Sequence, residues 1–280
     1  MINPKLINPQ SIVVIGASND VQKPGGKVLK NLLGSSFKGE IMAVNPKETE
    51  VQGVRCYSKV EELPQVDCAI LGIAAKYCPH TVRVLAQEKG TGGFIILSAG
   101  FSEENEVGAA LEKEIVETIN SVNGTLIGPN CTGYLNTNYC GNFAEPVPPL
   151  DPHGVDFITG SGATAVFITE HGITNGLKFN SVWSVGNSAQ TGIEEVLEHL
   201  DLTFDPVKSS RVIMLYMENV GNPHKLLKHA VSLYNKGCRI AAIKSGGSAA
   251  GSRAASSHTG ALATSDVAVE ALFRKAGIVR

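Results

Sequence analysis

The sequence predicts two α/β domains, each built on a doubly wound parallel sheet. Apolar runs of about five residues alternate along the chain with segments of helical period, which is typical of consecutive βα units. The length of 280 residues is sufficient for two hydrophobic cores. A cluster of four prolines interrupts the alternation, which restarts after it. We therefore expect a first domain at residues 1–145 and a second at residues 146–280.

The first half contains five expected strands and three expected helices. The apolar runs that predict strands are Ser11–Gly16, Glu40–Asn45, Val66–Ile73, Gly93–Leu97 and Thr125–Ile127. The segments of helical period are Gly26–Leu33, Pro79–Lys89 and Glu104–Asn120. This alternation predicts parallel strands joined by helical crossovers.

The segment Glu145–Pro152 separates the two halves and contains the four clustered prolines. Proline fixes its own φ angle and has no backbone N–H, so these residues do not fit a central strand or a helix interior. Proline clusters are typical of connecting segments. We interpret this segment as an interdomain linker.

The second half repeats the alternation. The expected strands are Val155–Thr159, Lys178–Val185, Arg211–Tyr216 and Arg239–Lys244. The expected helices are Ala163–His171, Thr191–Leu200, His224–Asn235 and Ala261–Lys275. The last residues, Gly277–Arg280, resemble the start of a further strand. We expect the natural chain to continue from a domain edge, with a natural terminus as the alternative.

Composition and charge exclude several classes of protein. The net charge of -2 leaves no basic excess to neutralise phosphates, which argues against general binding to nucleic acid or membrane surfaces. The six cysteines form no CxxC pair and no metal-ligand spacing. No signal-peptide pattern opens the sequence, and no apolar run is long enough to span a bilayer. We expect a cytoplasmic protein without a metal site.

His258 is the first candidate catalytic residue. It follows the glycine- and serine-rich run Ser245–Ser252, between an expected strand and an expected helix. Open α/β sheets bind ligands at the carboxyl ends of their strands, and imidazole can act there as nucleophile, base or phosphate carrier. The alternative is a solvated loop histidine.

A second candidate site is the turn after the strand Val155–Thr159. A helix that starts here offers backbone N–H groups to an anion, and two hydroxyl groups add to them. The residues expected to form the site are Ser161, Gly162, Ala163 and Thr164. Helix capping by Ser161 is the competing interpretation, and it is compatible with anion binding.

Glu218 ends an otherwise apolar strand. A carboxylate at that position can orient an imidazole on a neighbouring strand end and raise its basicity. The alternative is a solvated glutamate at the end of a strand.

The first domain carries a candidate phosphate-binding turn at Gly16-Ala17-Ser18. Glycine allows close approach of a ligand, and the following helix start favours a phosphate. The turn lacks the GxGxxG pattern of dinucleotide-binding proteins. The second strand ends at Lys47 instead of an acid, which suits a phosphorylated ribose, as in coenzyme A or NADP. The alternative is a surface lysine after an Asn-Pro turn.

Two further strand ends in this domain offer small or polar residues. One is Ile96-Leu97-Ser98, and the other is the turn Gly128-Pro129-Asn130. Each of them alone is explained by turn chemistry. Four such turns on one sheet edge favour a nucleotide-like ligand.

Together these residues resemble the NDP-forming acyl-CoA synthetases, which include succinyl-CoA synthetase α-subunits and ADP-forming acetate–CoA ligases. The resemblance extends from about residue 11 to the end, and the sequence around His258 is closest to the acetate–CoA ligase branch. The matching motifs are Val14-Ile15-Gly16-Ala17-Ser18, Val44-Asn45-Pro46-Lys47, Ser98-Ala99-Gly100-Phe101-Ser102, Gly128-Pro129-Asn130-Cys131, Ser161-Gly162, Val185-Gly186-Asn187, Tyr216-Met217-Glu218 and Ser257-His258-Thr259-Gly260.

The resemblance implies a Rossmann-like CoA-binding domain followed by a flavodoxin-like domain. It implies a reaction that interconverts acyl-CoA, ADP and phosphate with the free acid, CoA and ATP, through an acyl phosphate and phosphorylated His258. Glu218 would orient His258, and the helix start at Ser161 would hold the phosphoryl group. The implied CoA contacts are Gly16, Ala17, Ser18, Lys47, Ile96, Leu97, Ser98 and Asn130.

Two departures from the family pattern are visible. The family usually has Ser-Gln-Ser-Gly where this chain has Thr159-Gly160-Ser161-Gly162, so a glutamine contact is lost. No ATP-grasp domain and no P-loop pattern is present. Mg-ADP or Mg-ATP would therefore bind a partner β-subunit or a further domain. The expected partners are CoA with a small carboxylic acid or acyl-CoA, and we expect an oligomer.

Two other functions compete with this one. A non-catalytic CoA- or nucleotide-binding regulator would need the first domain but not the combination of Glu218, His258 and the helix start at Ser161. An NADP-dependent oxidoreductase is disfavoured by the missing GxGxxG pattern and by the lack of a recognisable hydride-transfer residue.

Overall fold

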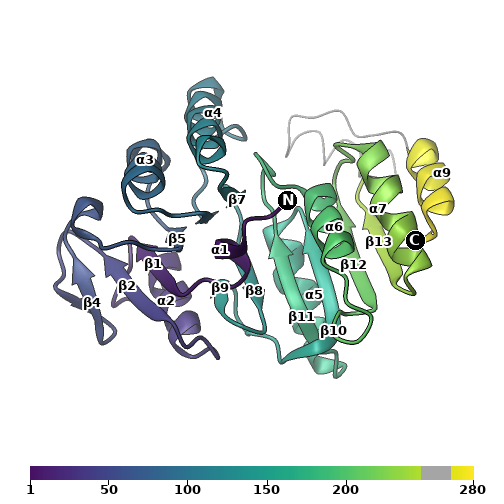
Figure 1. Ribbon diagram of the computed structural model, residues 1–280, viewed down its shortest axis with the longest axis horizontal. Coiled ribbons are helices and arrows are strands. Elements are labelled where there is room, and N and C mark those ends of the chain that lie inside the picture. Colours follow the sequence, from purple (N-terminus) through teal and green to yellow (C-terminus); the bar gives the residue numbers. More distant parts are fainter. Residues whose placement is uncertain (247–265) are drawn as a thin grey trace. The chain divides into compact units, whose positions relative to one another are not determined.

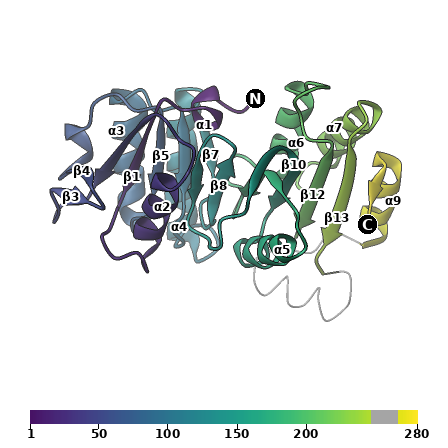
Figure 2. The same cartoon turned by 90° about the horizontal axis from the view of Figure 1, so that it is seen from below.

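The computed structural model describes residues 1–246 and 266–280, which pack as two compact units (Figures 1 and 2). The first unit consists of Ile2–Val147 together with the short segment Gly186–Gln190. The second consists of Pro148–Val185 and the chain from Thr191 onward, with Met1. Two α/β units are the fold class predicted from the alternation of strands and helices.

The first unit is a Rossmann-like sheet with the strand order β3-β4-β2-β1-β5-β6-β7. All neighbours run parallel except β3 and β4, which form an antiparallel hairpin. The strands are β1 (Ser11–Ile15), β2 (Glu40–Val44), β3 (Glu50–Val51), β4 (Val54–Tyr57), β5 (Cys68–Leu71), β6 (Gly93–Ile96) and β7 (Thr125–Ile127). The chain moves from β1 to β2 in one direction and onward from β5 in the other. This places a topological switch point between β1 and β5.

Helices cover both faces of this sheet. Right-handed crossovers in opposite directions put α2 on one face and α3 and α4 on the other (Figure 1). Phe94 on β6 belongs to the same buried cluster as Val82 of α3 and Ile119 of α4. The helical elements are α1 (Pro4–Ile7), α2 (Pro24–Leu33), η1 (Val60–Glu62), η2 (Ala75–Tyr77), α3 (Cys78–Glu88) and α4 (Glu106–Ser121).

The second unit is a parallel sheet whose strands follow the order β14-β13-β12-β10-β11. This order is flavodoxin-like, and its switch point lies between β10 and β12. The strands are β10 (Leu150–Thr159), β11 (Phe179–Ser184), β12 (Val212–Met217), β13 (Arg239–Lys244) and β14 (Ile278–Val279). The helices are α5 (Gly162–Thr174), α6 (Ile193–Leu202), α7 (Pro223–Asn235) and α9 (Asp266–Ala276).

The expected linker is wrong at its carboxyl-terminal end, because β10 already begins at Leu150 and includes Pro152. Leu150 and Val155 both pair with Phe179, so the intervening residues bulge out of the ladder. Pro152 is exposed in this bulge. Proline is tolerated at a bulge because no ladder hydrogen bond is required of it there.

Several short elements were not predicted from the sequence. They include α1, the β3–β4 hairpin, and a second antiparallel hairpin of β8 (Gly133–Asn136) and β9 (Cys140–Asn142). Of the expected helix Ala261–Lys275, the structure describes the part from Asp266. Among the described residues, every helix is too short or too polar to cross a bilayer.

Candidate functional site

The carboxyl ends of the strands of the first unit are joined by a line of close contacts. At one end of this line, the Asn45 side chain after β2 donates a hydrogen bond from Nδ2 to the Ala17 carbonyl at 2.8 Å. The same side chain accepts the backbone N–H of Lys47 at 2.9 Å. The turn after β1 and the turn that carries Lys47 are thereby held together, and Lys47 itself is exposed.

The turn after β1 depends on glycine at two positions. Gly16 adopts a φ of +81°, a left-handed conformation that side chains disfavour. Gly25, in the first turn of α2, lies so close to this turn that a Cβ atom would stand 2.1 Å from the Gly16 carbonyl oxygen. The amino terminus of α2 is therefore pressed against the turn. Helix amino termini favour anions, so the arrangement suits a phosphate.

The line of contacts continues across β5, β6 and β7. Gly16 also lies against Gly72, the residue that follows β5. The Ser98 hydroxyl, after β6, donates to the Ile73 carbonyl. The backbone N–H of Asn130, after β7, donates to the Ser98 carbonyl at 2.9 Å. The four turns singled out in the sequence are thus brought to one edge of one sheet.

Three of the expected CoA contacts are buried, and one of them is Ala17 in the turn after β1. Ile96 is fully buried at the end of β6, and Leu97 is 7% exposed. These two residues can reach a ligand only through their main chain. Ser98 is half-buried and Asn130 is exposed, so their side chains are accessible.

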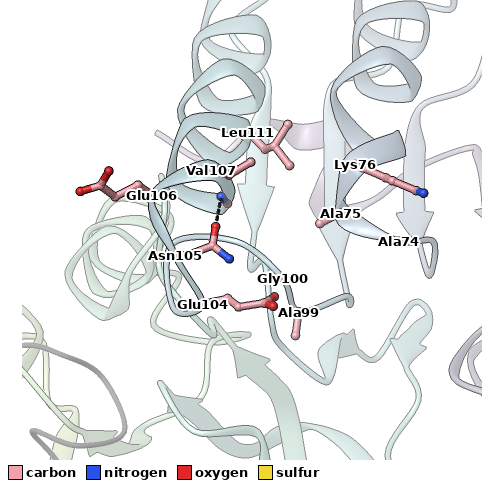
Figure 3. A pocket seen from close by; sticks show the side chains of 11 residues that line it. Ala74, Ala75, Lys76, Ala99, Gly100, Glu104, Asn105, Glu106, Val107 and Leu111 are labelled. Atoms are coloured by element: carbon pink, nitrogen blue, oxygen red, sulfur yellow. Dashed lines mark hydrogen bonds between the residues drawn. The ribbon is translucent and has the colours of Figure 1, made fainter.

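A pocket of about 780 Å³ opens beside Ser98, between η2 and the start of α4 (Figure 3). The Glu104 carboxylate turns toward Gly100, whereas Lys76 and Glu106 point away from the pocket. Apart from the polar Asn105, small and apolar side chains form the rest of its wall, with Ala74, Ala75, Ala99, Val107 and Leu111 among them. Such a wall suits an uncharged part of a ligand whose phosphates lie on the neighbouring turns.

The segment Gly186–Gln190 belongs to this edge although it follows β11 in the chain. Gly186 and Asn187 lie against the turn before Asn130, where the Asn187 N–H donates to the Pro129 carbonyl at 3.0 Å. Asn187 Nδ2 also donates to Glu103 at 2.5 Å and to Glu112 at 3.0 Å. The Val-Gly-Asn motif was noted in the sequence, but this contact with the loop after β6 was not foreseen.

In the second unit, Ser161 caps α5. Its hydroxyl accepts the backbone N–H of Thr164 at 3.3 Å, and its own N–H donates to the Thr159 hydroxyl at 3.0 Å. Two of the four expected anion-binding N–H groups are therefore already engaged. Those of Gly162 and Ala163 belong to the first turn of the helix, where no intrahelical acceptor exists. These two N–H groups are the ones suited to an anion.

Glu218 follows β12, which neighbours β10, the strand before this helix start. The Gly160 N–H donates to the Tyr216 carbonyl at 3.2 Å, which joins the ends of β10 and β12. Thr159 pairs with Tyr216 in the ladder. Ser161 and Glu218 each lie two residues beyond this pair. The half-buried Glu218 and the start of α5 thus both follow strands that flank the switch point of the second sheet, where open α/β sheets bind ligands.

Two charged residues near Glu218 were not recognised in the sequence. Glu194 on α6 is 6% exposed and accepts the backbone N–H groups of Gly221 and Asn222 at 2.9 and 3.1 Å, which holds the loop after Glu218. Lys244 ends β13, and burial lowers its pKa while the charges of Asp266 and Glu218 act in the opposite direction. Only Lys244 carried a signal, as a charged residue at the end of an apolar strand.

His258 lies outside the described residues. Ser245, at the start of the run that leads to it, donates its N–H to the Met217 carbonyl at 2.9 Å. The described chain therefore leaves β13 beside the carboxyl end of β12, which ends at Met217, one residue before Glu218.

Comparison with known proteins assigns each of the two units to a domain family. Residues 10–137 match the family model described as a CoA binding domain, and residues 152–280 match that of a succinyl-CoA ligase like flavodoxin domain. The α-subunit of acetate–CoA ligase (ADP-forming) II of Pyrococcus furiosus is 38% identical over 97% of this chain and 58% of its own length. Acetate–CoA ligase (ADP-forming) I of Archaeoglobus fulgidus is 37% identical over 98% of this chain and 39% of its own length.

A solved structure agrees with these matches. It is the dinucleotide-forming acetyl-coenzyme A synthetase 1 of Candidatus Korarchaeum cryptofilum, in complex with phosphate and ADP. It superposes with a TM-score of 0.87 and 31% identity, over 97% of this chain and 57% of the other. The chain thus spans between about two fifths and three fifths of the length of these relatives. It consists of a CoA-binding domain followed by a succinyl-CoA ligase-like flavodoxin domain, and over nearly its whole length it is similar to ADP-forming acetate–CoA ligases.

Proposed function

We propose that this chain is the CoA-binding and phosphohistidine-bearing part of an ADP-forming acyl-CoA synthetase, with acetate as the acid. The observation that carries the proposal is the pairing of two strand ends at the switch point of the second sheet: β10, which leads to Ser161, and β12, which leads to Glu218, are joined there by the hydrogen bond from the Gly160 N–H to the Tyr216 carbonyl. A domain of the CoA-binding family precedes this second sheet in the same chain. A regulator that only sensed CoA would have no use for this pairing.

The first unit holds CoA through the turns at the carboxyl edge of its sheet. The turn Gly16-Ala17-Ser18 and the start of α2 receive the diphosphate, because backbone N–H groups and the helix dipole both favour negative charge. Lys47 is exposed beside this turn and pairs with the phosphate on the ribose. Ser98 and Asn130 contact the remainder of the CoA molecule.

The reaction proceeds by two transfers. An oxygen of inorganic phosphate attacks the carbonyl carbon of the acyl-CoA, the C–S bond breaks, and CoA leaves as the thiol after taking up a proton. A ring nitrogen of His258 then attacks the phosphorus of the acyl phosphate, and the P–O bond to the acyl group breaks to release the carboxylate. An oxygen of ADP finally takes the phosphoryl group, which gives ATP and restores His258.

The described residues of the second unit support the phosphoryl transfers. Glu218 accepts a hydrogen bond from the second ring nitrogen of His258, which fixes the orientation of the ring and raises the basicity of the attacking nitrogen. The N–H groups of Gly162 and Ala163 donate to the phosphoryl oxygens as charge develops on them.

Mg-ADP or Mg-ATP binds an ATP-grasp domain, on a partner subunit or on a longer form of the chain. The relative from Pyrococcus furiosus is itself named as a subunit α, which supports the first arrangement. The complete enzyme is then an oligomer that contains both parts.

The test is phosphorylation of the complete enzyme, reconstituted with its ATP-grasp part, by γ-labelled ATP and Mg²⁺. We expect label that is lost in acid and kept in base, and its absence from His258→Ala. The exposed His153 provides the matched control His153→Ala, which should be labelled normally. Label that persists in His258→Ala overturns the assignment of the phosphohistidine. Calorimetric titration should show binding of CoA, and binding of NADP alone would favour an oxidoreductase.

A further inference from the structure

Gln52 lies at the tip of the β3–β4 hairpin, at a φ of 51°. Its side chain reaches out of the hairpin toward the turn after β1. Gln52 Nε2 donates to the Ser18 carbonyl at 2.8 Å and to the Gly26 carbonyl at 2.9 Å. Both hydrogens of the amide are therefore used, one on the turn and one on the first turn of α2.

The contact is reciprocal. The backbone N–H of Gln52 donates to Asn19 Oδ1 at 2.9 Å. Asn19 Nδ2 in turn lies 3.4 Å from the Glu50 carbonyl. The hairpin and the turn are thus joined by hydrogen bonds in both directions, and the Gln52 amide is the part that also reaches α2.

These bonds determine where the N–H groups of the turn point. The Ala17 carbonyl is held by Asn45, and the Ser18 carbonyl is held by Gln52. In a trans peptide the C=O of one residue and the N–H of the next point in opposite directions. The N–H groups of Ser18 and Asn19 are therefore directed away from the two amide side chains. Successive N–H groups arranged in this way form an anion-binding concavity.

We infer that Gln52 is a positioning residue for the diphosphate of CoA, which acts by fixing the turn at Ser18 against the start of α2. The inference rests on the proposed function of the first unit. Gln52 does not itself touch the ligand. It holds the Ser18 carbonyl away from the ligand, so that the N–H group of Asn19 faces the diphosphate, and it ties this turn to the Gly26 carbonyl in the first turn of α2.

If Gln52 had only a structural role, removing its side chain would destabilise the hairpin; a positioning role predicts a different result. The hairpin keeps its other attachments without the Gln52 side chain, because β4 pairs with β2 and Asn19 still accepts the backbone N–H of Gln52. Loss of the amide should therefore leave the fold intact and reduce the affinity for any ligand that contains the diphosphate. The phosphate on the ribose, assigned to Lys47, should not be affected.

The experiment uses Gln52→Met in the complete enzyme, because methionine keeps the length of the side chain and removes both donors. We expect the Kd and KM for CoA to rise about tenfold, with little change in kcat. The Kd for 3′-dephospho-CoA should rise by the same factor, since both ligands contain the diphosphate. Gln52→Glu should lose more affinity, because a carboxylate cannot donate to the carbonyls and repels the diphosphate.

Two controls separate the possible results. Gln65→Ala removes another glutamine that donates to a main-chain carbonyl, that of Glu88 at 3.0 Å, and should bind CoA normally. Lys47→Ala should instead reduce the preference for CoA over 3′-dephospho-CoA. Equal CoA affinity in Gln52→Met and the wild type overturns the inference alone, as does a variant that unfolds at the assay temperature. A wild-type enzyme that binds neither ligand overturns the proposed function as well.

Discussion

Asn187 and Glu103 are 84 positions apart in the chain, yet Asn187 Nδ2 donates to Glu103 Oε2 at 2.5 Å. Glu103 Oε1 in turn accepts the backbone N–H groups of Gly100 and Phe101 at 2.7 and 3.2 Å. Burial acts to raise the pKa of Glu103, but the hydrogen bonds from Asn187 and Gly100 outweigh it and bring this pKa below its usual value. A residue that follows β11 thereby orders the loop after β6, which carries Ser98.

Asn187→Ala should loosen this loop, because the Glu103 carboxylate loses its side-chain donor. We expect faster amide hydrogen exchange in the peptide that contains Gly100 and Phe101, and a several-fold higher KM for CoA. Hydrogen-exchange mass spectrometry measures the first effect directly. Asn175→Ala, at the end of α5, is the matched control and should leave exchange at this loop unchanged. Unchanged exchange in Asn187→Ala would contradict the role of this contact.

The buried carboxyl group of Asp156 should make the stability of the protein depend on pH. Burial raises the pKa of Asp156 to about 6 from the usual 3.8, although hydrogen bonds from Ser181 and Asn180 act to lower it. Between these two values the folded protein keeps a proton that the unfolded chain has released. The free energy of unfolding therefore falls as pH rises through this window, by roughly 3 kcal/mol in total.

Asp156→Asn removes this titration, and its amide oxygen can still accept the two hydrogen bonds. We expect the variant to be more stable than the wild type by roughly 2–3 kcal/mol at pH 7.5 and nearly equal to it at pH 4. Urea unfolding at the two pH values measures the difference. Asp205→Asn, at an exposed carboxylate whose pKa is lowered by backbone hydrogen bonds, should show no gain at pH 7.5. A gain from Asp156→Asn that is equal at both pH values would refute the explanation.

Glu194→Ala tests the support of the loop after Glu218. The variant leaves the backbone N–H groups of Gly221 and Asn222 without their acceptor, and each of these hydrogen bonds contributes about 0.5–1.5 kcal/mol to stability. We expect a lower Tm and slower phosphorylation of the complete enzyme. Glu194→Gln keeps an acceptor oxygen and should retain most of the activity. The exposed Glu170 on α5 supplies the control Glu170→Ala, and equal effects of the two alanine variants would count against this role.

Substitution by alanine should have opposite effects on stability at Gly25 and at Gly160. Gly25→Ala places a methyl group 2.1 Å from a backbone oxygen of the turn after β1, so α2 must move. We expect a loss of about 1–3 kcal/mol in stability and loss of CoA binding. Nothing lies within 4 Å of a Cβ atom on Gly160. Gly160→Ala should therefore fold with unchanged or slightly higher stability in a thermal unfolding experiment. Tolerance of Gly25→Ala would show that the turn and α2 are less tightly packed than described.

The periodicity of the sequence was sufficient to predict most of the strands of both sheets. Apolar runs such as Thr125–Ile127 and Arg239–Lys244 coincide with β7 and β13. The short elements could not be predicted, because a strand of two residues such as β3 contains too little pattern. Pro152 was wrongly assigned to the linker for a different reason. Its strand tolerates it through a bulge, which depends on how β10 pairs with β11.

The sequence by itself determined which turns carry the candidate site. Consecutive parallel strands end at the same edge of a sheet, so Gly16, Ser98 and Asn130 had to lie on one edge once the strands were known. The residues that hold these turns were decided only by the tertiary structure. Gln52, Asn187 and Glu194 act on groups that lie 26 to 85 positions away, and no local pattern records such a hydrogen bond. It forms only when folding brings its donor and acceptor together.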